Sequence, residues 1–124
     1  MSEAAEGFKG AIDRSVLTSL RELQDQGEPD IVAEVGGLFL KHAPQKIAAM
    51  KTAIEAGDAK ALEVAAHGLK SSSSYIGAIK LSAISKELES MGRKCELEGA
   101  LERAILVQTE FERVKAALEE EIKR

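Results

Sequence analysis

The stretch from Asp58 to Gly77, DAKALEVAAHGLKSSSSYIG, predicts a helix with a single apolar face. At about 100° per residue, its apolar side chains fall within about 60° of Leu62 around the helix axis. These side chains are Ala65, Ala66, Leu69 and Ile76. Gly57 is typical of a helix end and Asp58 of a helix cap, so the predicted helix begins there. His67 falls at about 140° from Leu62, and we therefore expect its imidazole to face solvent.

Small and charged side chains surround His67 on this predicted solvent face. They are Lys60, Glu63, Lys70, Ser71 and Ser74. Gly68 adds no side chain, so the surface of a partner can approach the imidazole closely. Neutral imidazole is a nucleophile near pH 7, and the Lys70 ammonium lies one turn away, where it can offset the charge of an accepted phosphoryl group. The pattern therefore indicates an accessible nucleophilic histidine beside a cation, with an exposed histidine that has no such role as the alternative.

The composition of the whole chain predicts a single all-α domain. Of its 124 residues, 44% are hydrophobic, 31% are charged and 3% are aromatic. This balance excludes a disordered chain and argues against an aromatic-rich β-sandwich. Residues that favour helices, mainly Ala, Leu, Glu and Lys, dominate the sequence. A chain of this length forms one domain around one hydrophobic core.

Charge and hydropathy argue against two classes of partner. The net charge of −4 comes from mixed signs without a basic cluster, so we expect no nucleic acid partner. The apolar runs are too short to span a membrane and the amino terminus is acidic, so we expect no membrane partner. Cys95 is the only cysteine and cannot form an internal disulfide, which is typical of a reducing compartment. Together these features predict a soluble cytoplasmic protein.

Turn and cap signals divide the chain into a lead-in and a helical region. Residues 1–12 are expected to form a flexible N-terminal lead-in, and residues 13–124 a helical bundle domain. Asp13 predicts the cap of a short helix and Asp30 the cap of a long one. The apolar residues of the short helix are Val16, Leu17, Leu20 and Leu23. Those of the long helix are Ile31, Val35, Leu38, Phe39, Ala43, Ile47, Met50 and Ile54.

Pro44 lies inside the apolar stripe of the long helix. An interior proline removes one backbone hydrogen bond and costs about 3 kcal/mol when nothing compensates. We therefore predict a kink at Pro44, with a complete break of the helix as the alternative.

Two more apolar stripes follow the helix of residues 58–77. The first consists of Leu81, Ile84, Leu88, Met91 and Cys95, and the second of Leu101, Ala104, Ile105, Phe111, Leu118 and Ile122. Because the connections are short, successive helices are expected to be antiparallel neighbours. The predicted fold is an up-down-up-down antiparallel four-helix bundle with a short additional N-terminal helix. Cys95 is then expected to be a small side chain of the core.

Other chemistries lack the residues that they need. The chain has neither of the glycine-rich loops that bind nucleotide phosphates. Its histidines, His42 and His67, fall on different predicted helices without a neighbouring ligand, so no metal site is expected. A nucleophilic pair of Cys95 and His67 is disfavoured because Cys95 lies on an apolar stripe. We interpret His42 as a surface or boundary histidine.

The residues around His67 resemble the signature of histidine-containing phosphotransfer (HPt) domains. The matching motifs are Ala66-His67-Gly68-Leu69-Lys70-Ser71-Ser72-Ser73, Gly77-Ala78, Leu81, Leu88-Glu89 and Gly92-Arg93. The resemblance implies a bundle whose exposed histidine takes a phosphoryl group from an aspartate of one response-regulator receiver domain and passes it to another. It implies a phosphocarrier rather than an enzyme, with sensor or hybrid histidine kinases as further partners.

The same resemblance implies roles for individual residues. His67 is the implied phosphoacceptor, Lys70 its charge partner, and Glu89 the side chain that orients the imidazole. We expect Mg²⁺ in the partner receiver and no cofactor bound by this chain. Ser71 departs from the family, which usually has glycine at this position, and the departure bears on which receivers fit.

A receiver is expected to dock over the face around His67. The residues expected at that interface are Ile12, Val16, Lys60, Val64, Gly68, Ser71 and Ser74. We interpret Ser72 and Ser73 instead as a helix end and the cap of the following helix. Since one bundle accounts for the apolar stripes, we expect a monomer.

Two other interpretations stay open. One is the helical hairpin of a sensor kinase, which also presents a phosphorylatable histidine. Gly68 and the short chain argue against it, because that hairpin has an acidic residue directly after the histidine and an ATP-binding domain behind it. The other is an inactive HPt-like helical scaffold that binds a receiver or kinase without carrying phosphate. The presence of His67, Lys70 and Glu89 argues against such a scaffold.

Overall fold

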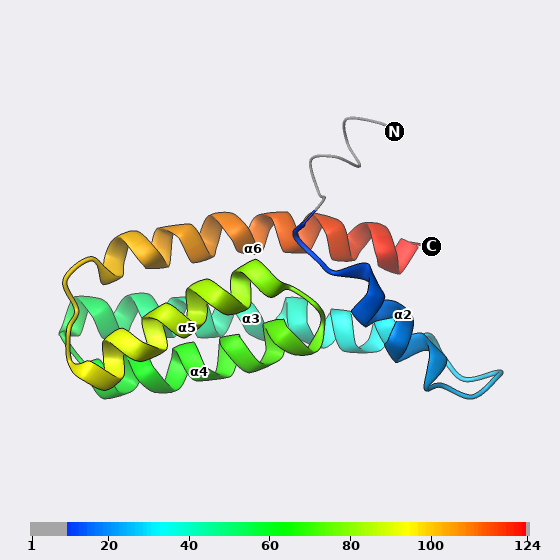
Figure 1. The fold of residues 1–124 in the computed structure, drawn as a ribbon, viewed down its shortest axis with the longest axis horizontal. Coiled ribbons are helices and arrows are strands. Elements are labelled where there is room, and N and C mark those ends of the chain that lie inside the picture. Colours follow the sequence, from blue (N-terminus) through cyan, green and yellow to red (C-terminus); the bar gives the residue numbers. More distant parts are fainter. Residues whose placement is uncertain (1–9, 124) are drawn as a thin grey trace.

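Aspartate caps set the start of three helices. The computed structural model describes residues 10–123, which form α2 (Arg14–Glu22), α3 (Ile31–Ala56), α4 (Ala59–Tyr75), α5 (Ile79–Lys94) and α6 (Ala100–Lys123) (Figure 1). Each capping carboxylate accepts one backbone N–H: Asp13 from Ser15 at 3.0 Å, Asp30 from Val32 at 3.2 Å, and Asp58 from Ala61 at 3.0 Å. The three predicted caps are therefore confirmed.

The four long helices form an antiparallel bundle. Helices α3, α4, α5 and α6 run in alternating directions, and α2 lies at the end of the bundle where α3 begins (Figure 1). Helix α4 packs on α3 and α5, and α6 closes the bundle by packing on both α3 and α5. The predicted up-down-up-down four-helix bundle with a short additional N-terminal helix is confirmed. No helix in the described part of the chain combines the length and the apolarity needed to cross a membrane.

Apolar side chains from all four long helices meet inside the bundle. The most deeply buried include Met50, Leu62, Leu69, Leu81, Leu88, Val107, Val114 and Leu118. Between α3 and α6, the ring centroids of Phe39 and Phe111 lie 6.0 Å apart. Burial of one such side chain contributes about 1.5–3 kcal/mol, so this core fixes how the helices face one another.

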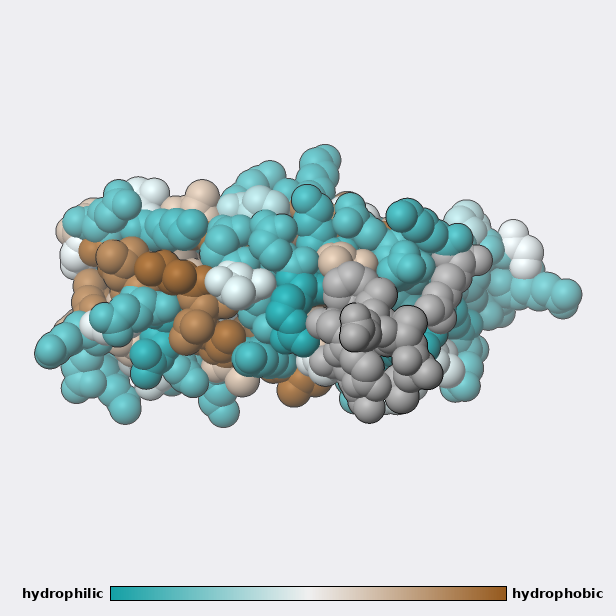
Figure 2. All heavy atoms as spheres, turned by 90° about the horizontal axis from the view of Figure 1, so that it is seen from above, coloured by the Kyte–Doolittle hydropathy of each residue, from teal (hydrophilic) through white to brown (hydrophobic). Residues whose placement is uncertain are grey.

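The buried face of α6 differs from the predicted stripe. Leu101 and Ile105 are 52% and 56% exposed, whereas Val107 and Val114 are fully buried. Ile105 lies about 160° from Val107 around the helix, so the two side chains cannot share one buried face. The start of α6 holds more apolar residues than one face can bury, and some of them are therefore exposed. Figure 2 shows an apolar area toward the end of the molecule where α6 begins, and Leu106 is also half-exposed there.

Two apolar residues at helix ends lie outside the core. Cys95 is exposed and forms the C-cap of α5 with a φ of 57°, so the prediction of a core cysteine is wrong. Leu23 is the C-cap of α2 and is 80% exposed. Periodicity places both residues on an apolar stripe. Each helix ends one residue earlier, however, so the backbone at Leu23 and Cys95 no longer directs the side chain toward the core.

Helix α3 runs unbroken through Pro44. The alternative of a complete break is therefore wrong, whereas the kink stays a prediction. Ala43 and Ile47, on either side of Pro44, are buried in the core, and their packing offsets the lost hydrogen bond. Leu38 departs from the predicted stripe, because it is 54% exposed.

Helix α4 continues through the four serines and ends at Tyr75. Ser73 is fully buried, and the hydroxyl of Ser72 donates to the backbone carbonyl of Leu69. Helix α5 is preceded by Ala78, which provides no side-chain cap. The prediction that Ser72 and Ser73 end one helix and cap the next is therefore wrong.

The segment before α2 is anchored on the turn between α4 and α5. Residues 1–9 of the predicted flexible lead-in lie outside the described residues, whereas Ala11 and Ile12 are buried, with 0% and 7% exposure. The backbone N–H of Asp13 donates to the carbonyl of Gly77 at 2.7 Å. The end of the predicted lead-in therefore belongs to the core.

Ion pairs attach α2 to the bundle. Arg21 lies 3.1 Å from Asp30 and 3.5 Å from Glu121, and Arg14 lies 2.6 Å from Glu121. The Arg21 guanidinium lowers the pKa of Asp30 more than burial raises it. These contacts join α2 to the start of α3 and the end of α6.

Candidate functional site

His67 presents one ring nitrogen to the protein and leaves the other accessible. Its side chain on α4 is 61% exposed, so the predicted solvent-facing imidazole is confirmed. The Nδ1 atom lies 2.6 Å from Oε2 of Glu89 on α5. Because a carboxylate only accepts hydrogen bonds, Nδ1 carries the proton in the neutral ring and Nε2 has the lone pair. The ring is oriented through Nδ1 and available for chemistry at Nε2.

Glu89 is a nearly buried carboxylate with three partners. Its side chain is 6% exposed, its Oε1 accepts from Lys70 Nζ at 2.7 Å, and Arg93 Nη2 lies 3.4 Å from its Oε2. The Lys70 ammonium and then His67 hold the pKa of Glu89 below its ordinary value, although burial acts in the opposite direction. Glu89 is therefore ionised near neutral pH and balances the charge of its cationic neighbours.

Gly92 allows α4 and α5 to approach closely beside these residues. A Cβ atom at Gly92 would lie 2.7 Å from the carbonyl oxygen of Ala59 and 2.7 Å from the backbone nitrogen of Glu63. Any side chain there would push the two helices apart. Arg93 follows Gly92 and crosses this contact, where its Nε donates to the Glu63 carboxylate at 3.2 Å.

A match to a known protein family is consistent with the geometry around His67. The family model described as "Hpt domain" matches residues 34–117, which extend from α3 into α6. The chain belongs to the Hpt family. Hpt proteins are phosphotransfer intermediates of phosphorelays, and they interact with receiver domains and kinases.

Relatives along the whole length support the assignment of this Hpt domain. Histidine-containing phosphotransfer protein 5 of Arabidopsis thaliana is 31% identical over 115 residues, which are 90% of this chain and 73% of the relative. Histidine-containing phosphotransfer protein 4 of Arabidopsis thaliana is 30% identical over 121 residues, which are 96% of this chain and 94% of the relative. The crystal structure of histidine-containing phosphotransfer protein B from Pseudomonas aeruginosa PAO1 matches with a TM-score of 0.81 and 32% identity, and it covers 92% of this chain and 96% of that chain.

The expected docking residues of the Hpt domain fall into two groups. Those on α4 lie at the surface around His67, and they are Lys60, Val64, Gly68, Ser71 and Ser74. Val64 stands out, because 61% of this apolar residue is exposed. The other group precedes or begins α2. Val16 is half-buried, its side chain close to Gly77, and Ile12 is buried in the core. The expectation of an accessible Ile12 is therefore wrong.

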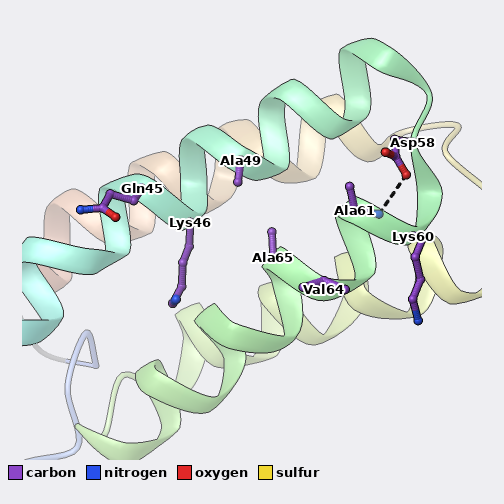
Figure 3. A pocket seen from close by; sticks show the side chains of 8 residues that line it. All are labelled: Gln45, Lys46, Ala49, Asp58, Lys60, Ala61, Val64 and Ala65. Atoms are coloured by element: carbon purple, nitrogen blue, oxygen red, sulfur yellow. Dashed lines mark hydrogen bonds between the residues drawn. The ribbon is translucent and has the colours of Figure 1, made fainter.

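Lys46 is a cation near His67 that the sequence analysis missed. It extends from α3 toward α4 (Figure 3), and a Cβ atom at Gly68 would lie 3.3 Å from its Cε. The missing side chain of Gly68 therefore leaves room for Lys46. The same lysine lines a shallow groove between the two helices, together with Ala49, Ala61, Val64 and Ala65. No sequence spacing relates residues of different helices, so no pattern pointed to Lys46.

Glu63 and Arg93 also belong to the site, although the sequence analysis gave them no role. The Glu63 carboxylate accepts from Lys60 Nζ at 3.3 Å as well as from Arg93. Arg93, and to a smaller extent Lys60, lowers the pKa of Glu63. A signal was present, because Arg93 lies one turn after Glu89 and Glu63 one turn before His67, so that each pair shares a helix face.

Proposed function

We propose that His67 is the phosphoacceptor of this Hpt domain: it takes a phosphoryl group from an aspartate of one receiver domain and passes it to a second receiver. The observation that carries the proposal is the 2.6 Å contact between Nδ1 of the exposed His67 and the ionised Glu89. In the neutral imidazole that contact places the proton on Nδ1, so that Nε2 is the accessible nitrogen with a lone pair, as a nucleophile requires. A sensor or hybrid histidine kinase is the proposed source of the phosphate upstream.

The transfer uses the lone pair of Nε2. Nε2 attacks the phosphorus of the receiver's aspartyl phosphate, the new N–P bond forms, and the P–O bond to the aspartate breaks. The aspartate leaves as a carboxylate, and the imidazole keeps its proton on Nδ1. The ring then carries positive charge, which the Glu89 carboxylate stabilises through the same hydrogen bond. Attack on Nε2-bound phosphorus by an aspartate of the second receiver reverses these steps.

Lys70 is proposed as the charge partner of the phosphoryl group. Its ammonium lies at Oε1 of Glu89 and its side chain is 29% exposed, so it can turn toward a group on Nε2. Phosphoryl transfer depends mainly on positioning and on stabilisation of charge. A single ammonium beside the transferred group supplies part of that stabilisation.

We propose that the receiver brings the Mg²⁺ on which this chemistry depends. Mg²⁺ prefers carboxylate oxygens and water as ligands. The carboxylates of the site, Glu89 and Glu63, are each paired with cationic side chains, so this donor set does not fit the metal. The chain itself is proposed to carry phosphate without a cofactor of its own.

The proposed docking face consists of exposed α4 residues with the edge of α2. Its members are Lys60, Val64, Gly68, Ser71, Ser74 and Val16. Ser71 adds a hydroxymethyl group to this face, and we expect it to affect which receivers fit rather than whether transfer occurs. We also propose a monomer, because one copy closes the four-helix core. A cytoplasmic location is proposed because the exposed Cys95 is a free thiol, which suits a reducing compartment.

Incubation with a radiolabelled, phosphorylated receiver tests this function. We expect the label on His67, stable in base and lost in acid, and we expect His67→Gln to abolish it. His42→Gln is the matched control, because His42 is also exposed and should keep full labelling. Undiminished labelling of His67→Gln would overturn the assignment. Binding of a receiver without any label would instead identify an inactive scaffold.

A further inference from the structure

Two cations share the Glu89 carboxylate, but only Lys70 has a role in the reaction so far. Lys70 Nζ lies 2.7 Å from Oε1, and Arg93 Nη2 lies 3.4 Å from Oε2. When Lys70 turns to a phosphoryl group on His67, Oε1 loses its donor. An ionised oxygen in a nearly buried position is unfavourable without a partner. Another donor is therefore needed at Glu89 in the phosphorylated state.

Arg93 is suited to replace Lys70, because Glu63 fixes it from the other side. The Arg93 side chain is 62% exposed, and an arginine this exposed samples many rotamers unless a partner restrains it. Its Nε donates to Oε2 of Glu63 at 3.2 Å, and Glu63 is itself only 20% exposed. A guanidinium has five donors in a rigid fork, so Arg93 can serve both carboxylates at once.

We propose that Glu63 is a positioning residue of the phosphotransfer reaction: it holds Arg93 beside Glu89, so that Arg93 replaces Lys70 on the carboxylate while Lys70 contacts the phosphoryl group. The inference rests on the proposed role of His67. Only hydrogen bonds are exchanged, and both cations keep their protons. Glu89 thus stays paired, and the imidazole stays oriented, both before and after phosphate arrives.

A second ion pair of the same type provides a matched control. Arg103 Nε lies 2.8 Å from Oε2 of Glu87, and this pair joins α5 to α6 with side chains that are 43% and 56% exposed. Within the described part of the chain, neither member of this pair forms a hydrogen bond or ion pair with Glu89. If the Glu63 pair only stabilised the fold, its loss and the loss of the Glu87 pair would have the same kind of effect.

The lifetime of the phosphorylated histidine tests the proposal. The unaltered protein, Glu63→Gln and Glu87→Gln are loaded from the receiver that labels His67 fastest, the receiver is removed, and loss of label is followed. We expect Glu63→Gln to shorten the lifetime by about threefold to tenfold, the effect of one hydrogen bond of ordinary net strength. Glu87→Gln should leave the lifetime unchanged, with a similar melting temperature for both variants.

A double variant shows whether Glu63 acts through Arg93. Adding Glu63→Gln to Arg93→Gln should shorten the lifetime no further than Arg93→Gln alone, because residues of one network are not additive. Additive effects would overturn the proposal, as would a Glu63→Gln lifetime equal to that of the unaltered protein.

The position of Arg93 is measured separately, without phosphate. In NMR spectra of the unphosphorylated protein, we expect the Arg93 Nε–H group to be ordered, and to become mobile in Glu63→Gln but not in Glu87→Gln. Retained order in Glu63→Gln would overturn the positioning role. If the unaltered protein takes no label at all, the proposed function fails. If it labels normally and Glu63→Gln behaves identically, only this inference fails.

Discussion

Glu89 controls an exposed histidine from a nearly buried position. Its carboxylate contacts His67 and Lys70, and the backbone that carries it lies between the buried residues Leu88 and Gly92. The imidazole therefore gains a fixed orientation without being buried itself. This matters because the ring must be oriented before reaction and yet reachable by the active site of another protein.

We predict that Lys70→Ala slows phosphotransfer without unfolding the bundle. The variant loses the ammonium proposed to stabilise the phosphoryl group, so the transfer rate should fall by about tenfold to a hundredfold. It also removes the donor of Glu89 Oε1, which should cost about 1–2 kcal/mol of unfolding free energy. Rapid-quench kinetics with a phosphorylated receiver and urea unfolding measure the two effects.

Lys51→Ala is the control for Lys70→Ala. Lys51 also joins two helices, since its Nζ donates to Gln108 at 3.3 Å, but it contacts no residue of the site. Its transfer rate should equal that of the unaltered protein. A Lys70→Ala variant that unfolds at room temperature would show that Lys70 is mainly structural.

Among individual residues, helical periodicity predicted the exposure of His67, but it did not predict the side chains that other helices bring to the site. The angles around the helix axis, measured from Leu62, correctly placed His67 and Lys70 outside the apolar face, because both residues lie on the same helix as Leu62. Glu89 came only from the family resemblance. The i+4 spacing could have placed Arg93 beside Glu89, but not beside Glu63. That contact and the approach of Lys46 to α4 cross between helices, and the distance between two helices depends on packing that a single sequence does not display.

Helices α4 and α5 are joined closely at the position of Gly92, and this contact places the Glu63–Arg93 pair. We predict that Gly92→Ala lowers the unfolding free energy by about 1–3 kcal/mol, because its Cβ would overlap the α4 backbone. The shift between the helices should also weaken the pair, and therefore shorten the lifetime of phosphorylated His67. Thermal melting and label loss measure both effects.

Gly37→Ala provides the opposite expectation for Gly92→Ala. Gly37 also lies inside a helix, but a Cβ atom there would meet no heavy atom within 4 Å. The variant should raise stability by about 0.5–1 kcal/mol, since alanine favours a helix more than glycine does. A rise in melting temperature for both variants would contradict the proposed close contact at Gly92.

At the scale of elements, caps were predictable and buried faces were less so. The Asp13, Asp30 and Asp58 caps depend on local hydrogen bonds, which short sequence patterns contain. The buried face of α6 depends on how α3 and α5 pack against it, so Ile105 was misplaced. Cys95 was misplaced because the helix end, rather than the apolar spacing, decides its exposure.

The whole molecule should lose stability in acid. The pKa values of Asp30, Glu63 and Glu89 are lowered in the folded state by their cationic partners. Below about pH 5 the unfolded chain therefore binds more protons than the folded one. The stabilising contribution is complete above the ordinary carboxyl pKa values and is lost as the pH falls through the lowered ones. Urea unfolding between pH 7 and pH 3 should show this loss.

Glu89→Gln assigns part of the acid sensitivity to the site. An amide does not titrate in this range, so the fall in unfolding free energy between pH 6 and pH 3 should be smaller in this variant, although its stability at pH 7 is lower. An equal fall in both proteins would contradict the depressed pKa of Glu89.

The overall architecture itself was predictable, because helix-favouring composition and short connections permit few arrangements.

The residues proposed to carry out the chemistry of this protein occupy one uninterrupted piece of chain. His67, Lys70, Glu89 and the Glu63–Arg93 pair all lie on the hairpin of α4 and α5, between residues 59 and 94. Helices α2 and α3 contribute adjoining surface, such as Lys46, without supplying the reacting groups. Because most of the proposed docking face also lies on α4, the same hairpin carries both the proposed reaction and most of the surface that a receiver would contact. For a protein engineer, transplanting α4 and α5 together would move the proposed phosphoacceptor, its charge partner and most of the proposed docking face in one piece.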